Sequence, residues 1–139
     1  MKTSVVLLWV LTLLGLVAGF WFMTIGGMPP TALLIDSSPL VQLIDFLLIV
    51  LCVVVLVVGL TSHGRSGLLK LAGWAGPLLG ALGCAWGLFT LWQVSHVTHV
   101  TRLAILAPSY AESVMPLALG LLCAAVAATL KGRAAAAAA

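Results

Sequence analysis

Residues 70–95 read KLAGWAGPLLGALGCAWGLFTLWQVS, and the glycines in this stretch recur at intervals of three, four, three and four residues. In a helix that turns by about 100° per residue, positions with this spacing form one narrow stripe. Each interior glycine costs about 0.5 to 1 kcal/mol relative to alanine, so such a stripe needs a packing reason. Close contact between helices in lipid supplies that reason, and we expect the stripe to face a neighbouring helix. The glycines are Gly73, Gly76, Gly80, Gly83 and Gly87.

The composition places the chain in a membrane. Of its 139 residues, 63% are hydrophobic and only 6% are charged, whereas about 25% of the residues of a soluble domain are charged. The prediction is an all-α integral membrane protein with no soluble domain. The net charge of +3 is too small and scattered to indicate nucleic-acid binding. The three cysteines, Cys52, Cys84 and Cys123, lie in apolar stretches that match no disulfide or metal pattern, so no metal or cofactor is expected.

Four apolar stretches are long enough to span a bilayer. They lie at about residues 3–25, 39–60, 70–95 and 109–130. The competing interpretation of the first is a signal peptide, whose apolar region usually has only about 7 to 15 residues. We interpret residues 1–133 as a single transmembrane domain with four spanning helices. The alanines at 134–139 carry no side-chain information and are left out of the interpretation.

Local signals mark where the spans begin and end. Glycines and prolines at 26–30 end the first span. Ser38 followed by Pro39 fits a capping residue and the first helical position, because the N–H that proline lacks would be unpaired there. Ser109 and Glu112 have the spacing of a capping box, which predicts that the last span begins at residue 109. Pro77 removes one backbone hydrogen bond inside the third span and is expected to bend it.

Few polar groups lie within the spans or next to them. Asp45 is about two turns into the second span, where its side chain either reaches the headgroup region or serves a function within the membrane. His96 and His99 are three residues apart and could share a helical face, but two histidines do not make a metal site. We expect both histidines to lie at the membrane interface.

The basic residues are distributed unequally between the two sides of the predicted bundle. With four spans, Arg102 is alone on one side, and both termini are predicted to be cytoplasmic because cytoplasmic loops are enriched in Lys and Arg. The short connections leave no room for a soluble catalytic domain, so an enzyme is not expected. The five cations on the other side are Lys2, Arg65, Lys70, Lys131 and Arg133.

Two stretches resemble the MotA/TolQ/ExbB family of proton channels, the stator or motor subunits of flagella and of energised outer-membrane systems. Residues 77–89, PLLGALGCAWGLF, are similar to the family's pattern of glycine, two apolar residues, glycine, threonine and a closing phenylalanine. Residues 107–122, APSYAESVMPLALGLL, are similar to its pattern of Ala-Glu, a short apolar gap, then Ala, an apolar residue and Gly-Leu. The predicted directions of the third and fourth spans agree with those of the family's two core helices.

The resemblance implies roles for particular residues. Gly80, Phe89 and Gly120 correspond to packing positions, and Glu112 corresponds to the acidic residue that opens the last core helix. Two features depart from the family: the large cytoplasmic region between its first and second helices is missing, and an extra first helix is present.

The positions that correspond to the family's pore threonines are Ala81 and Leu117. By helical periodicity, the helix faces that contain them carry small residues and few polar side chains that could hold water. The candidate pore-lining residues on these faces are Ala81, Cys84, Leu88, Ser113 and Leu117, with Gly120 and Ala124 beside the last two. The candidate ion-pathway residues are Thr90, Gln93 and Glu112, near the outer end, and Asp45.

In that family a homo-oligomeric ring, commonly a pentamer, surrounds the single helices of a partner dimer, whose aspartate carries the proton. The resemblance therefore implies that this chain is the ring subunit in a bacterial inner membrane, with a single-span partner like ExbD, TolR or MotB. The leading hypothesis is a stator-like subunit that couples proton flow to mechanical work. The alternative is a non-conducting structural or scaffolding subunit that keeps the packing and has lost the channel.

Overall fold

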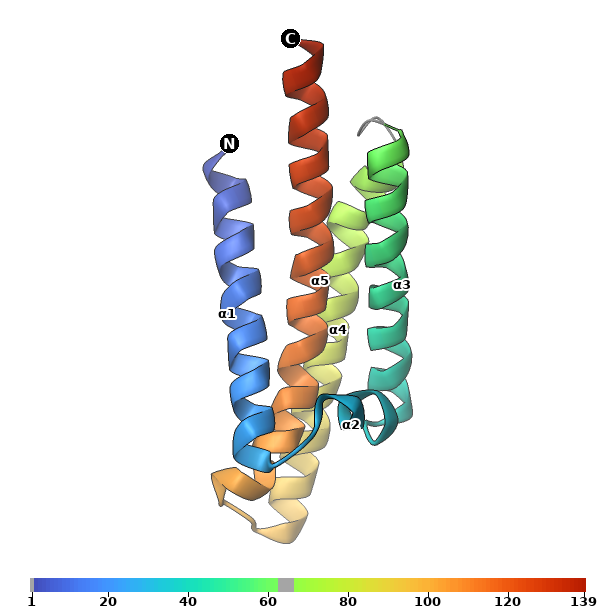
Figure 1. Cartoon of the computed structure of the whole chain (residues 1–139). Helices are drawn as coiled ribbons and strands as arrows, with labels where there is room; N and C mark the ends of the chain where they lie inside the picture. Colours follow the sequence, from blue (N-terminus) through green and yellow to red (C-terminus); the bar gives the residue numbers. More distant parts are fainter. Residues whose placement is uncertain (1, 63–66) are drawn as a thin grey trace.

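The structure is a computed structural model and describes residues 2–62 and 67–139. Four helices in this part of the chain are long and apolar enough to cross a membrane, which confirms the prediction of an all-α, multi-span protein with no soluble domain evident. A short additional helix lies in the first connection (Figure 1). The helices are α1 (Thr3–Gly26), α2 (Pro30–Ile35), α3 (Pro39–Thr61), α4 (Gly67–Thr98) and α5 (Leu103–Ala138).

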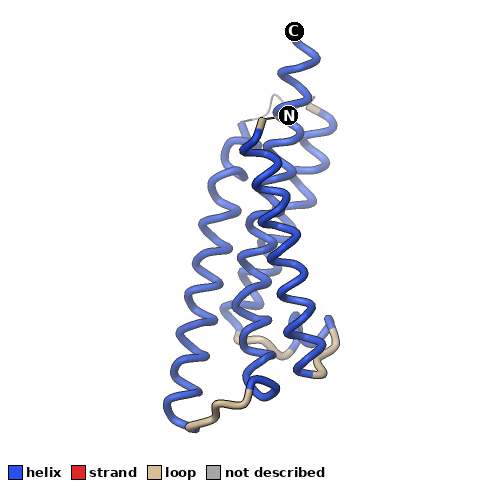
Figure 2. The backbone as a smooth tube through the Cα atoms, turned by 90° about the vertical axis from the view of Figure 1, so that its left-hand side faces the viewer, coloured by secondary structure: helices blue, strands red, loops and turns tan. Residues whose placement is uncertain are grey.

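The last helix, α5, is the one around which the others are arranged. It packs against α4, α1 and α3, and α3 also packs against α4, whereas α1 has its main contact with α5 alone. Figures 1 and 2 show the long helices side by side, with the two termini at the same end of the bundle. As a result, α5 is the most buried of the four spanning helices.

The break after the first span lies where the sequence predicts it, but it contains a helix that the sequence did not predict. α1 ends where Gly27 takes a left-handed conformation with φ 63°, and the Gly27 N–H points back to the carbonyls of Met23 and Thr24. Glycine adopts this conformation without the steric penalty that a Cβ would bring. Pro30 then begins α2, because its fixed φ suits the first turn of a helix.

Both α4 and α5 run beyond their predicted ends. α4 continues to Thr98 and α5 begins at Leu103, so only residues 99–102 connect them. The polar composition of this segment suggested a longer loop, but no glycine or proline lies between residues 88 and 107 to interrupt a helix. His99 makes the turn with φ 52°, a conformation that residues other than glycine rarely adopt.

The predicted side-chain caps of α3 and α5 are wrong. Because α5 begins at Leu103, Ser109 and Glu112 lie inside the helix, and the Ser113 hydroxyl donates a hydrogen bond to the Ser109 carbonyl at 2.8 Å. Pro39 begins α3 as predicted, but the buried hydroxyl of Ser38 has no hydrogen-bond partner among the described residues. Neither helix therefore begins with a side-chain cap.

The contact between α4 and α5 brings two backbones together. A Cβ added at Gly80 would lie 2.6 Å from the Pro116 carbonyl oxygen, and one added at Gly76 would lie 2.9 Å from the Gly120 carbonyl oxygen. Gly120 packs in turn against the backbone of Gly76 and Gly80. None of these three glycines has room for a side chain, which is the packing reason that the stripe requires.

The glycine stripe is not uniform along its length. Gly83 and Gly87 are buried against Pro116 and Ser113 of α5, as the spacing predicts. A Cβ added at Gly73 would meet nothing within 4 Å. The expectation that Gly73 also packs closely against a neighbouring helix is therefore wrong, because the open space beside it is not filled by α5.

The first helix uses the same kind of contact, which the sequence interpretation missed. A Cβ added at Gly15 would lie 3.0 Å from the Cβ of Ala118, and Gly19 is buried against α5 as well. The Trp9 indole N–H also donates a hydrogen bond to the Thr129 hydroxyl at 3.0 Å. Two small residues four positions apart are a common motif at helix contacts in membranes, so this pattern could have revealed the α1–α5 contact.

We expect Gly80→Leu to separate α4 from α5, because a branched side chain cannot fit beside the Pro116 carbonyl. Overpacking typically costs about 1 to 3 kcal/mol, and contact with a backbone leaves little scope for relaxation. Gly73→Leu is the matched control, since it makes the same change in the same stripe where space is open. Thermal unfolding in detergent measures both variants. Equal unfolding temperatures for the two would contradict the assignment of Gly80 to the helix contact.

Candidate functional site

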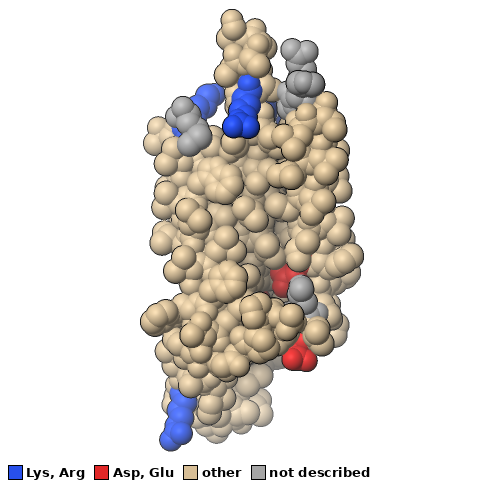
Figure 3. All heavy atoms as spheres, in the orientation of Figure 1, with Lys and Arg blue, Asp and Glu red and all other residues tan. Residues whose placement is uncertain are grey.

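The chain has three acidic residues, and the fold brings Glu112 within electrostatic range of the other two. Asp45 on α3 and Glu112 on α5 are close enough for their charges to interact, and Glu112 also interacts with Asp36, which follows α2. In Figure 3 the visible acidic atoms lie in the lower half of the bundle. The visible basic atoms lie at the upper end, except for one group at the lower tip. The fold thus separates the acidic site from most of the basic side chains.

Asp45 is the most unusual of these groups because it is buried inside a span. Its side chain is only 2% exposed, and its Oδ1 atom has no hydrogen-bond partner among the described residues. It lies on the same buried face of α3 as Ile44 and Leu48. The interpretation in which this side chain reaches the headgroup region is therefore wrong. An ionised carboxylate buried without a partner is costly, so the position calls for a proton or another cation.

Glu112 supplies the second carboxyl of the site from α5. It is half-buried, and its position beside Asp45 brings two negative groups together inside the bundle. Pro116 lies one turn further along α5 and lacks an N–H, so it cannot donate the usual helical hydrogen bond to the Glu112 carbonyl. The backbone next to this carboxyl therefore lacks one of its regular helical hydrogen bonds.

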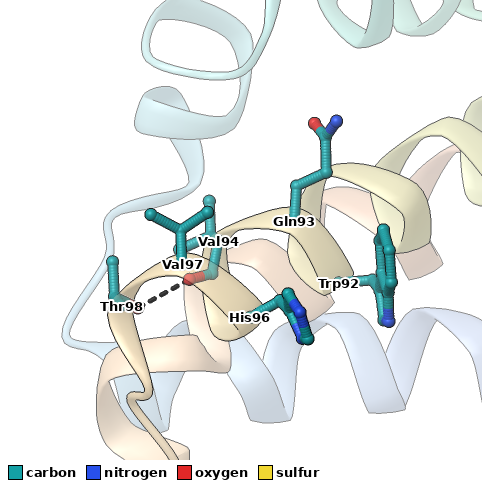
Figure 4. Close-up of a pocket in the computed structure, with 6 residues that line it drawn as sticks. All are labelled: Trp92, Gln93, Val94, His96, Val97 and Thr98. Atoms are coloured by element: carbon teal, nitrogen blue, oxygen red, sulfur yellow. Dashed lines mark hydrogen bonds between the residues drawn. The ribbon is translucent and has the colours of Figure 1, made fainter.

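Thr90 and Gln93, the other candidate ion-pathway residues, are not joined to the carboxyl pair by any hydrogen bond in the described chain. The Thr90 hydroxyl donates to the Gly87 carbonyl at 2.8 Å, within its own helix. Gln93 is exposed and lines an open cavity of about 580 Å³ at the end of α4. Figure 4 shows Gln93 extending away from the rings of Trp92 and His96.

An aromatic ladder runs along the exposed face of α4 toward this cavity. Trp86, Phe89, Trp92 and His96 follow one another with ring-centroid distances of 6.0, 6.3 and 5.4 Å. His99 lies beyond the end of α4, so it does not share a helical face with His96. The two histidines therefore do not form a common binding site.

The candidate pore-lining residues do not converge on one path within a single chain. Ser113 is buried against Gly87, and the backbone of Leu117 lies against Gly80. Ala81 and Leu88 are exposed on α4, and Cys84 is half-buried. Helical periodicity correctly grouped these positions by face, but the two faces do not both meet at the contact between α4 and α5.

No model of a known protein family matches the chain, and no curated protein or solved structure shows significant similarity to it. The fold defines the class of protein: a multi-pass membrane protein with four helices, among the described residues, that are able to span the bilayer. Within that class, the chemistry that distinguishes this chain is the pair of carboxyls between α3 and α5.

We expect Asp45→Asn to preserve the fold and to raise the free energy of unfolding in detergent by about 1 kcal/mol. The reason is that the substitution removes the cost of burying a negative charge in a carboxylate whose Oδ1 atom has no hydrogen-bond partner among the described residues. Asp36→Asn is the control, because Asp36 is exposed and its charge is solvated. A clear loss of stability in Asp45→Asn alone would mean that the carboxylate has a stabilising partner, contrary to this assignment.

Proposed function

We propose that the chain is a proton-handling, stator-like subunit of a bacterial inner membrane, which forms a homo-oligomeric ring around a single-span partner and couples proton flow to mechanical work. The observation that carries this proposal is the buried carboxyl of Asp45, whose Oδ1 atom has no hydrogen-bond partner among the described residues and whose charge interacts with that of Glu112. Ionisable residues within a span are rare and commonly mark the path of an ion or a proton. The resemblance to the MotA/TolQ/ExbB family supports the same function, because it points to Glu112 through a different argument.

A proton is the cation that suits this site. Two carboxyls whose charges interact repel each other when both are ionised, and the uptake of a proton by one of them relieves that repulsion. Among the residues that the structure describes, no group of three His, Cys, Asp or Glu side chains could hold a metal ion. Taking up and releasing a proton requires no further ligand from the chain.

Proton flow through such a ring depends on a partner. In a single chain, the route between α4 and α5 is closed by the contacts of Gly76 and Gly80 with the backbone of α5. A dry constriction of this kind excludes water and ions. By the family resemblance, the partner is like ExbD, TolR or MotB, and its intramembrane aspartate carries the proton past the constriction as a neutral acid.

The second candidate function is a scaffolding subunit without a channel. The close contact between α4 and α5, which leaves no open route in a single chain, favours it. Ala81 and Leu117 stand where the resembled family has pore threonines, and the Ser113 hydroxyl bonds to a carbonyl of its own helix. In that function the α4–α5 packing would be retained for assembly, and the carboxyl pair would not carry protons.

The proposed orientation places both termini in the cytoplasm. It is supported by the charge distribution. Lys2 and Lys70 lie at the starts of α1 and α4 and Lys131 lies toward the end of α5, all at the end of the bundle that holds the termini, whereas Arg102 lies in the connection at the other end. We expect a membrane-impermeant maleimide to label Arg102→Cys from the periplasmic side of intact cells. Arg133→Cys should be labelled only after the membrane is opened. The reverse pattern would overturn the orientation.

The functional proposal is tested by proton flux in liposomes. The subunit alone is expected to give no flux above the lipid background, because its route is dry and closed. With a single-span partner we expect flux, and we expect Asp45→Asn and Glu112→Gln each to reduce it at least about tenfold. Thr61→Val is the control, since it removes a polar group from the same helix as Asp45 but lies at its exposed end.

Each outcome of this experiment discriminates between the functions. Flux from the subunit alone would contradict the closed route. Partner-dependent flux that survives both carboxyl substitutions would remove Asp45 and Glu112 from the pathway. No flux with a partner that is otherwise active would favour the scaffolding subunit.

A further inference from the structure

A groove opens between α1, α4 and α5, near the end of the bundle that holds the two termini. α1 and α4 both pack against α5 but hardly touch each other, so a strip of α5 is left uncovered between them. The groove has a volume of about 310 Å³. This volume is at the lower end of the range for small-molecule sites, about 300 to 1,000 Å³, and suits part of a larger amphiphile.

The inner part of the groove is apolar and built from small residues. Ala124 and Ala127 of α5 and Leu8 of α1 line this part, whereas the exposed Trp74 of α4 lies at the edge of the groove. Gly73 also lines it, and this is the one glycine of the stripe at which an added Cβ would meet nothing within 4 Å. The open space beside Gly73, which the α4–α5 contact does not explain, therefore belongs to this groove.

Two lysines line the same groove at its polar end. Lys70 lies in the first turn of α4, three residues before Gly73, and Lys131 directly follows the apolar run of α5. Both side chains are exposed. The three acidic residues lie at or near the starts of α3 and α5, which are at the other end of the bundle. The amino end of α4 adds partial positive charge beside Lys70. The mouth of the groove is thus positively charged and lacks a carboxylate from this chain.

We propose that this groove binds an anionic phospholipid, with the phosphate between Lys70 and Lys131 and one acyl chain along Gly73, Ala124 and Ala127. The groove matches the polarity of a lipid, because its mouth is charged, like a headgroup at the membrane surface, and its inner part is apolar, like an acyl chain. Basic pockets between spanning helices bind acidic headgroups for this reason. The ring of Trp74, which is 77% exposed, suits the headgroup level beside the mouth. This site is distinct from the carboxyl pair, and its occupancy does not depend on proton flow.

Lipid selectivity follows from the charges at the mouth. A zwitterionic lipid brings its own ammonium group toward the two lysines, whereas an anionic lipid brings only negative charge and hydroxyls. A bound acyl chain also fills the space that α1 and α4 leave open on α5. The anionic lipid therefore adds a contact between α1 and the rest of the bundle. Its binding raises the temperature at which the bundle unfolds.

The experiment titrates the full-length protein in detergent with phosphatidylglycerol or with phosphatidylcholine of the same acyl chains. Binding is measured by native mass spectrometry and stability by thermal unfolding. We expect phosphatidylglycerol to bind more tightly and to raise the unfolding temperature more. The double variant Lys70→Gln/Lys131→Gln should weaken its binding by about 30-fold, the factor expected for the loss of two interfacial lysines.

Two further variants separate the groove from bulk charge. Lys2→Gln/Arg133→Gln removes the same charge near the same end but outside the groove, and it should change phosphatidylglycerol binding by less than about threefold. Gly73→Leu should fill the groove and weaken phosphatidylglycerol binding with both lysines in place. Equal losses in the two double variants would overturn the proposal. So would displacement of the lipid by inorganic phosphate, which would identify a site for a free anion.

Discussion

The contact on which the bundle depends is the approach of two backbones where Gly76 and Gly80 of α4 meet Gly120 of α5. Within lipid there is little hydrophobic force to hold helices together, so close van der Waals packing must supply the attraction. Glycine allows this packing at the cost of helix propensity, a cost that only a well-filled contact offsets. Because α5 is fixed against α4 in this way, its remaining faces can receive α1 and α3, and its carboxyl Glu112 is held beside Asp45.

Much of the fold could be predicted because apolar length and glycine spacing are local properties of the sequence. The four spans, the first break and the role of Gly80 all follow from them. The ends of α4 and α5 could not be predicted in this way, since polar residues such as His96 were placed outside the third span although no glycine or proline interrupts a helix there. The interpretation of Ser109 as a helix cap failed because a motif that fits a helix start also occurs inside a helix.

The candidate site was less predictable because it depends on which faces meet. Residue type alone identified Asp45 and Glu112 as unusual groups in an apolar chain, but only the fold shows that they are neighbours. Periodicity placed Ala81 and Leu88 on one face of α4 without revealing that this face is exposed. The same limit explains Gly73, whose spacing matches the stripe while its surroundings are open. Spacing defines a face of a helix, and the neighbouring helices decide what that face contacts.

The partnership of α1 with α5 also has a consequence for biosynthesis. α1 precedes α5 in the chain by three helices but has its main contact with it, through Gly15, Gly19 and the hydrogen bond from Trp9 to Thr129. Until α5 is inserted, α1 must reside in the bilayer with lipid in place of its native neighbour, which its uniformly apolar surface permits. Pairing of α1 with α5 is therefore a late event, because it has to wait until α5 has been synthesised and inserted.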